Sequence, residues 1–181
     1  MTQSGSDPSA TPRTPMRLAL GCDDAAFGLA QVIRRHLETN APVAVSVMDF
    51  GAFDAEPVDY PDVAEAVALA VREGSADRGV LLCGTGIGVA IAANKVPGVR
   101  AACCHDTYSA ERSRASNDAQ ILTMGARVVG PELALRILDT WLQTEFGGGP
   151  SARKVAKITA IERRFMVDPA PRPLQGEDPA P

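Results

Sequence analysis

The sequence predicts an α/β fold: a mostly parallel five-stranded sheet with helices on both faces, as in a Rossmann-like three-layer sandwich. Short apolar, strand-like segments alternate along the chain with segments of helical periodicity, which is typical of a parallel sheet. Several strand segments are apolar throughout, as strands buried on both faces should be. With 181 residues, the chain is long enough for one domain with a substantial core.

The first half of the chain supplies two strands and two helices. The run "RLALGC" (17–22) is apolar and ends at two aspartates, so it predicts a strand that stops at a polar turn. Apolar residues at helical spacing over 26–39 predict a helix, and the β-branched run 43–50 predicts the second strand. Pro61 is well placed to open the next helix, over 62–73.

The middle of the chain continues the alternation. "RGVLLC" (78–83) predicts the third strand, and a short helix follows that ends near Asn94. "GVRAACC" (98–104) predicts the fourth strand, again apolar throughout. Residues 106–115 predict a helix, and 119–125 the fifth strand.

Two helices complete the domain. Residues 130–146 are strongly amphipathic, with Pro131 near their start and a triple glycine after their end. Residues 151–165 place apolar side chains at helical spacing beyond the Gly147–Gly149 joint. This last helix has spare apolar surface, so we expect it to reach a partner subunit.

The two ends of the chain differ from the rest. Residues 1–15 are polar and contain proline, and residues 167–181 are rich in proline with little apolar content. Such segments cannot bury enough surface to fold, so both are predicted to be disordered. The folded domain is therefore expected over residues 16–166.

Composition and charge exclude several functions. The net charge of −4 gives no basic footprint, so nucleic acid is not an expected partner. No apolar run is long enough to cross a membrane, and the first residues lack the apolar core of a signal peptide. The four cysteines form no C-x-x-C motif and no zinc spacing, so we expect reduced thiols and a cytoplasmic location.

The stretch "LLCGTGIGVAIAANK" (81–95) joins a strand end, a thiol and a glycine-rich loop. In parallel α/β sheets, ligands bind at the carboxyl ends of the strands, where Asp23, Cys83 and His105 all fall. A dinucleotide loop would read G-x-G-x-x-G, whereas this loop reads G-x-G-x-G, follows the third strand and lacks a Walker lysine. The spacing therefore favours a reactive thiol over a phosphate cradle.

The residue types around Cys83 suit proton abstraction beside a carbonyl group. Free N–H groups in the loop can acidify the thiol, and Thr85 with the glycine amides can stabilise an oxyanion. Asp23 arrives from the neighbouring strand end and can bind hydroxyl groups. This chemistry needs neither a metal nor a cofactor, and acyl transfer would require a histidine to activate the cysteine.

Several blocks of sequence together resemble one known family. "GCD", "DYP", "CGTGIG..IAANK", "CHDTYSA", "ND", "MGARVVGPELA" and "FGGG" follow one another in the order found in the ribose-5-phosphate isomerase B/LacAB sugar-phosphate isomerases. The resemblance runs from about Arg17 to Arg164. It implies a homodimer or tetramer with an active site between subunits, and aldose–ketose isomerisation of a sugar or sugar phosphate through an enediol.

The resemblance also implies a role for each matching residue. Cys83 matches the base that moves the proton between C1 and C2, and Asp23 matches an aspartate that touches substrate hydroxyls. Thr85 matches the group that stabilises the enediolate. The remaining matches are substrate-binding positions, namely Gly84, Gly86, Gly88, Tyr60, Asn117 and Arg127.

Four positions depart from the family pattern. Asp24 stands where a histidine contacts the phosphate, and Ser116 where a histidine helps to open the sugar ring. Pro150 replaces one phosphate-binding arginine and Lys154 another, which keeps the charge but loses the bidentate fork. The loss of a ring-opening group matters little for a substrate that cannot cyclise. We therefore expect a short or acyclic sugar derivative, such as a tetrulose phosphate or an unphosphorylated keto-sugar acid.

Two alternatives remain open. If Asp24 faces solvent and Arg153 or Lys157 binds the phosphate, ordinary ribose 5-phosphate activity survives. Alternatively, the chain is an inactive sugar-binding subunit, or a LacAB-like partner that acts only with a second, histidine-bearing chain. The intact Cys83–Thr85 unit argues against a complete loss of chemistry.

Overall fold

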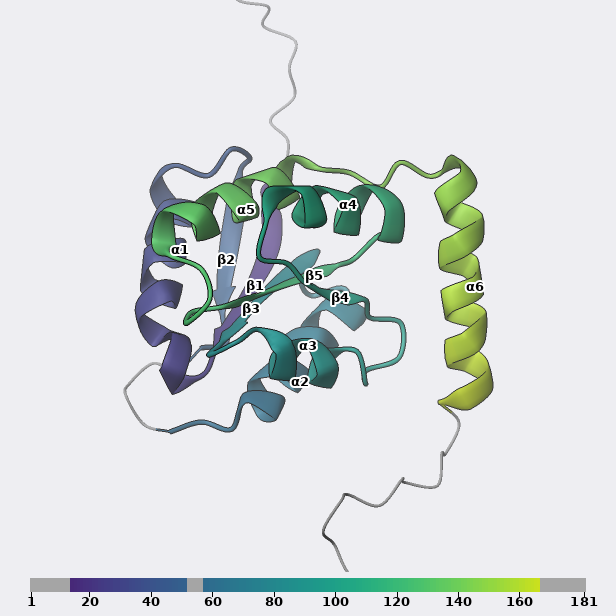
Figure 1. Ribbon diagram of the computed structural model, residues 1–181, viewed down its shortest axis with the longest axis horizontal. Coiled ribbons are helices and arrows are strands. Elements are labelled where there is room, and N and C mark those ends of the chain that lie inside the picture. The colour runs from purple at the N-terminus through teal and green to yellow at the C-terminus, as the bar shows by residue number, and fades with distance from the viewer. Residues whose placement is uncertain (1–13, 52–56, 167–181) are drawn as a thin grey trace, which may run out of the picture.

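The computed structural model describes residues 14–51 and 57–166, and five parallel strands form its core (Figure 1). The strands are β1 (Met16–Cys22), β2 (Val45–Asp49), β3 (Arg78–Cys83), β4 (Ala101–Cys103) and β5 (Ile121–Gly125). Their order in the sheet is β2-β1-β3-β5-β4, and every neighbouring pair is parallel. The predicted α/β fold is confirmed. The disordered ends predicted at 1–15 and 167–181 lie outside the described residues, apart from Thr14 and Pro15.

The strand order places β5 between β3 and β4, so β4 is an edge strand. It spans three residues, whose side chains are half-buried or exposed. The prediction of a longer, fully buried strand over 98–104 is therefore wrong. Gly98 has a φ of +89°, which is outside the range of a strand, and the chain enters β4 only after Arg100.

Seven helices pack around the sheet or beside it within the described residues. They are η1 (Asp24–Ala26), α1 (Phe27–Thr39), α2 (Tyr60–Arg72), α3 (Ile87–Ala93), α4 (Thr107–Asn117), α5 (Pro131–Gln143) and α6 (Gly149–Phe165). Helices α1 and α5 cover one face of the sheet, where Trp141 is completely buried. Helices α2 and α3 cover the other face, so the three predicted layers are present.

Helix α6 stands beside the body of the protein (Figure 1). It packs against α4, and none of its residues is buried. Its apolar side chains Ile158, Ile161 and Phe165 are between 43% and 61% exposed. The predicted spare apolar surface is therefore present. None of the described helices combines the length and apolar character that a membrane span requires.

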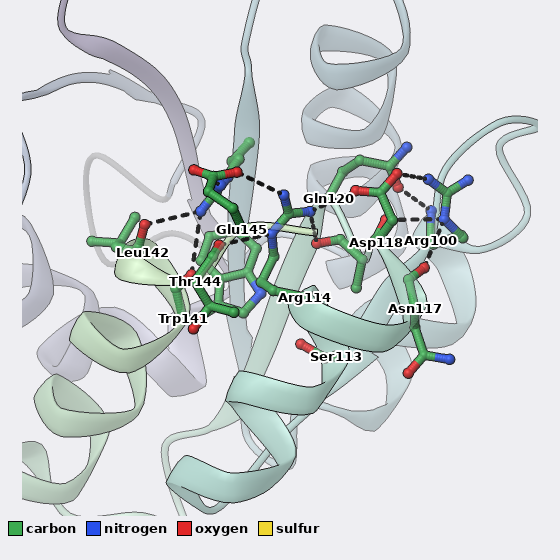
Figure 2. A network of polar contacts seen from close by, with 12 residues as sticks. Arg100, Ser113, Arg114, Asn117, Asp118, Gln120, Trp141, Leu142, Thr144 and Glu145 are labelled. Carbon is green, nitrogen blue, oxygen red and sulfur yellow. Dashed lines mark hydrogen bonds and ion pairs between the residues drawn. The ribbon is translucent and has the colours of Figure 1, made fainter. Parts of the chain in front are cut away.

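The amino ends of the strands are closed by a network of polar contacts around two buried arginines (Figure 2). The guanidinium groups of Arg78 and Arg114 lie 5.4 and 6.0 Å from the ring centre of Trp141. Arg78 donates to the main-chain carbonyls of Trp141 and Leu142, and both arginines pair with Glu145. Burial and the neighbouring charge of Arg114 lower the pKa of Arg78. The network ties β3, α4 and the end of α5 together.

Candidate active site

Cys83 is the last residue of β3, and its side chain is buried at the carboxyl end of the sheet. The chain turns immediately after it, and the N–H of Gly86 points back to the cysteine sulfur, with an N···S distance of 3.1 Å. This hydrogen bond fixes the position of the sulfur relative to the turn. The structure thus gives Cys83 a specific polar partner as well as an apolar environment.

The turn after Cys83 requires glycine and lies directly against the end of β5. Gly86 has a φ of +76°, and a Cβ atom there would be 2.7 Å from the carbonyl carbon of Met124. Gly125 is its counterpart in β5, because a Cβ atom at Gly125 would be 2.6 Å from the backbone of Thr85. Only glycine allows this approach of two backbones. The position of the turn is therefore set by β5.

Asp23 follows β1, so it lies beside the end of β3. Its N–H donates to the carbonyl of Leu82, and its carboxylate accepts from the N–H of Ala26. Burial raises the pKa of Asp23, and the hydrogen bond from Ala26 only partly offsets this effect. Strands β1 and β3 are neighbours in the sheet, but β2 lies on one side of this pair, and β5 and β4 lie on the other. The gap between β1 and β3 is therefore the topological switch point of the sheet, where α/β folds bind ligands.

Arg127 and Tyr60 line the same edge. The Arg127 side chain passes over Gly84, where a Cβ atom would lie 3.7 Å from its Cδ and Nε atoms, and its charge reaches Asp23. Tyr60 begins α2, and its ring would be only 2.7 Å from a Cβ atom at Gly88. Gly84 and Gly88 therefore make room for these two side chains.

Thr85 and the start of α3 supply polar groups toward the solvent. Thr85 is exposed, and its hydroxyl oxygen accepts from the N–H of Ile87 at 3.4 Å. The first N–H groups of a helix have no partner within the helix; here the N–H of Ile87 is taken by Thr85 and that of Gly86 by the Cys83 sulfur, so the Gly88 amide is the one available to an oxyanion among the predicted glycine positions 86 and 88. Asp24 is also exposed at this edge, and its negative charge contributes to the raised pKa of Asp23.

Three predicted site residues do not join this group within one chain. The carbonyl of Asn117 accepts from Arg100, which directly precedes β4, so Asn117 lies near the amino end of the sheet (Figure 2). Ser116 precedes it in α4. The Ser116 hydroxyl accepts a short hydrogen bond from Arg112. Lys154 is exposed on α6. The end of α4 is thus far along the strands from Cys83.

Two residues beside the glycine turn were not among the predicted catalytic or substrate-binding residues. Thr123 in β5 donates its hydroxyl to the carbonyl of Gly86 at 2.7 Å, and Nε2 of His105 accepts from the N–H of Gly125 at 3.1 Å. The sequence placed His105 at this edge, because it follows a strand end, but gave it no role. A single threonine in an apolar strand carried no signal, because threonine is common in strands.

The described residues contain no group of three or more histidine, cysteine, aspartate or glutamate side chains that could hold a metal ion. What the edge does hold is a thiol with an N–H donor on its sulfur, a buried carboxylate, an exposed hydroxyl and a cationic side chain. These groups are typical of an α/β enzyme that binds a small, polar, anionic molecule and transfers protons on it.

Comparisons with known proteins define the particular family. The profile described as Ribose/Galactose Isomerase matches residues 18–158. Ribose-5-P isomerase B of Listeria innocua is 52% identical over 82% of this chain and 99% of the relative. D-erythrulose-4-phosphate isomerase of Pectobacterium atrosepticum is 49% identical over 82% of this chain and 97% of the relative. The solved ribose-5-phosphate isomerase B of Clostridium thermocellum superimposes with a TM-score of 0.79 at 49% identity, over 82% of this chain and 99% of that one.

The chain belongs to the ribose/galactose isomerase family of ribose-5-phosphate isomerase B and LacAB. It is therefore an enzyme, an intramolecular oxidoreductase that interconverts an aldose and a ketose. The family resemblance predicted from the sequence motifs is confirmed.

Proposed function

We propose that the protein isomerises a short, acyclic sugar phosphate, such as a four-carbon tetrulose phosphate, with Cys83 as the base. The observation that carries the proposal is the buried Cys83 sulfur, which accepts the N–H of Gly86 at the carboxyl end of β3. The Cys83 thiolate removes the proton from the hydroxyl-bearing carbon beside the carbonyl group and later returns it to the former carbonyl carbon, while the proton of that carbon's hydroxyl group moves to the former carbonyl oxygen. An enediolate forms in between, and its oxygen accepts from the Thr85 hydroxyl and the Gly88 amide, since the Gly86 N–H is bonded to the Cys83 sulfur.

The other residues of the edge would bind the substrate. Asp23 accepts hydrogen bonds from the sugar hydroxyls, and Arg127 faces the anionic end of the molecule. Tyr60 lies against Gly88 at the side of this edge.

The proposed size of the substrate rests on Ser116 and Asp24. A serine cannot perform the ring opening for which the family resemblance implies a histidine, and a four-carbon aldose phosphate has no hydroxyl free to close a stable ring. The Pectobacterium relative, named D-erythrulose-4-phosphate isomerase, supports this choice. The exposed carboxylate of Asp24 adds negative charge to the edge, so phosphate binding would depend on the cations Arg127 and Lys154.

Ribose 5-phosphate is the second candidate substrate, and three observations favour it. The Listeria relative is named for this activity, Asp24 is exposed as this alternative requires, and Arg153 and Lys157 are exposed on α6, where they would replace the missing phosphate ligands. In this case other residues would compensate for the departures at Asp24 and Ser116, and the substrate would be unchanged.

Isomerisation of erythrose 4-phosphate and of ribose 5-phosphate, measured side by side, tests the proposal. We expect kcat/KM to be at least about tenfold higher for the four-carbon ester, and Cys83→Ala to lower kcat by about 10²–10⁴-fold, as for loss of a general base. Cys104→Ala is the matched control, because this buried thiol packs on the other face of the sheet. A preference for the ribose ester would establish the second candidate, and an unaffected Cys83→Ala variant would refute the cysteine base.

We further infer that the active site is shared between two subunits of a homodimer, or of a tetramer built from such dimers. The end of α4, with Ser116 and Asn117, is too far from Cys83 in the same chain to take part. The exposed apolar residues of α6 offer a surface for a second copy. A two-fold axis that brings this end of α4 to the partner's Cys83 would complete two sites at once.

Mixing two inactive variants tests the shared site. Cys83→Ala and Asn117→Ala are each expected to be nearly inactive, whereas heterodimers of the two contain one intact site. After unfolding and refolding together in equal amounts, about a quarter of wild-type activity should return, because half of the dimers then carry one good site of two. A mixture that stays inactive although dimers form would show that the two residues do not share a site.

The cytoplasmic location also stays a prediction.

A further inference from the structure

Thr123 is a polar exception in a buried strand. All five residues of β5 are buried, and the others are apolar or glycine. The Thr123 side chain is completely inaccessible to solvent, and its hydroxyl donates to the carbonyl of Gly86 at 2.7 Å. Valine has nearly the same shape and would avoid the cost of burying a hydroxyl group. The hydroxyl therefore requires an explanation beyond packing.

Gly86 is bonded both to Thr123 and to the catalytic sulfur of Cys83. Gly86 donates its N–H to Cys83 and accepts the Thr123 hydroxyl at its carbonyl group. Glycine has the widest backbone freedom of all residues, so its peptide planes need external bonds to stay in one orientation. The bond from Thr123 fixes the peptide plane that follows Gly86, and the close contact of Gly86 with the backbone of Met124 and Gly125 limits rotation of the plane before it, so the N–H stays on the sulfur.

The end of β5 is itself held in place from the far side. Strand β4 stops at Cys103, so the N–H of Gly125 extends past the last β4 residue. The imidazole of His105 accepts this N–H at 3.1 Å and continues the ladder of hydrogen bonds. Gly125 in turn lies against Thr85. The end of β5 on which the glycine turn rests is therefore hydrogen-bonded on both sides; Ala126 and Arg127 donate to the carbonyls of Cys83 and Gly84, and Thr123 adds the side-chain bond to Gly86.

We propose that Thr123 is a positioning residue for the reaction: its hydroxyl orients Gly86 so that the Gly86 N–H stays on the Cys83 sulfur. The inference rests on the proposed role of Cys83 as the base. Thr123 itself does not touch the substrate, because it is buried behind the turn. Its effect is on the proton transfer step and not on substrate binding.

Thr123→Val and Thr123→Ser form a matched pair for the test. Valine keeps the shape and removes the hydroxyl, whereas serine keeps the hydroxyl and removes a methyl group. We expect Thr123→Val to lower kcat by about tenfold or more, with KM within about threefold of wild type, because the Gly86 carbonyl loses the shorter of its two hydrogen bonds and keeps only the one from the N–H of Ala90, at 3.3 Å. Thr123→Ser should retain kcat within about threefold. Thr123→Ala takes the place of the valine variant if the latter does not fold.

A merely structural role would give a different pattern. Both variants would then lower the unfolding temperature while kcat per folded molecule stayed at the wild-type value, and that result would overturn the proposal. Equal losses of kcat in the valine and serine variants would overturn it as well, since the hydroxyl would not be the responsible group.

An NMR measurement separates this inference from the proposed function. The amide resonance of Gly86 should shift or broaden in Thr123→Val and stay near its wild-type position in Thr123→Ser, with no substrate present. If Cys83→Ala proves fully active, the cysteine base is refuted, while the resonance still shows whether Thr123 orients Gly86. A Gly86 resonance that is identical in wild type and Thr123→Val would refute the positioning role.

Discussion

Replacing Gly86 with alanine should damage both the stability and the activity of the enzyme, and a second glycine allows the causes to be separated. Gly86 and Gly74 have nearly equal φ angles, +76° and +75°. An alanine at either position carries the cost of a left-handed backbone, about 1–2 kcal/mol. A Cβ atom at Gly74 meets nothing within 4 Å, so Gly74→Ala measures this backbone cost alone.

Gly86→Ala adds crowding to the same backbone cost. The new Cβ atom would lie 2.7 Å from the Met124 carbonyl carbon, whereas ordinary contacts begin near 3.4 Å, so the turn must move by roughly 0.7 Å. Overpacking of this kind costs about 1–3 kcal/mol, which gives a total of about 2–5 kcal/mol. A displacement of this size next to the reacting groups can also lower the rate by about 10²-fold.

Thermal unfolding and steady-state kinetics of the two variants provide the measurement. For a domain of this size, about 1 kcal/mol corresponds to about 2–4 °C in Tm. Gly74→Ala should therefore lose a few degrees and keep its kcat, while Gly86→Ala should lose about 5–15 °C and most of its kcat. Equal effects of the two substitutions would refute the close packing of the turn against β5.

Three further predictions concern charge and burial. Burial raises the pKa of Asp23, so the folded protein binds the Asp23 carboxyl proton more tightly than the unfolded chain does, and the stability that this proton contributes is lost as the pH rises through the folded pKa. Asp23→Asn should therefore be more stable than wild type at neutral pH but not in acid, as denaturant titrations at both pH values will show. Arg78→Met should destabilise the fold by about 3 kcal/mol, because the carbonyls of Trp141 and Leu142 lose their donor, whereas Glu145→Gln should cost less than about 1 kcal/mol, since Glu145 is 75% exposed. Equal losses of stability in urea unfolding would contradict this order. Burial raises the pKa of the Cys104 thiol to about 11, so iodoacetamide should leave Cys104 unmodified at neutral pH until the chain unfolds, as peptide mass spectrometry can detect.

The sequence was sufficient for the layers of the fold because its signals there are local. Apolar runs and helical periods each occupy a few neighbouring residues, and their alternation defines a parallel sheet. The order of the strands was not predictable, because it depends on which crossover passes over which strand. The error at residues 98–104 followed from this: an apolar run looked like a buried strand, although β5 leaves β4 at the edge.

For the site, sequence reasoning found the residues with reactive or charged groups but not those that support them. Cys83, Asp23 and Arg127 lie at the same edge, since each stands at the carboxyl end of a strand or just after it. Thr123 contacts the glycine turn through its hydroxyl and Gly125 through its backbone, and both contacts depend on the register of β3 with β5. No spacing along the chain encodes that register.

The two ends of the sheet hold different groups, and the proposed dimer explains why both are fixed by hydrogen bonds or ion pairs. At the carboxyl end, hydrogen bonds from β5 hold a thiol in a glycine turn. At the amino end, Arg100 and Arg114 both pair with Asp118, which ends α4 in a left-handed conformation, and so fix the residues Ser116 and Asn117 just before it (Figure 2). An exposed helix end with no further role would not need two partly or fully buried arginines, whose desolvation is costly. If that helix end enters the partner's active site, its rigidity has the same purpose as that of the turn: each subunit presents one preorganised half of the site to the other.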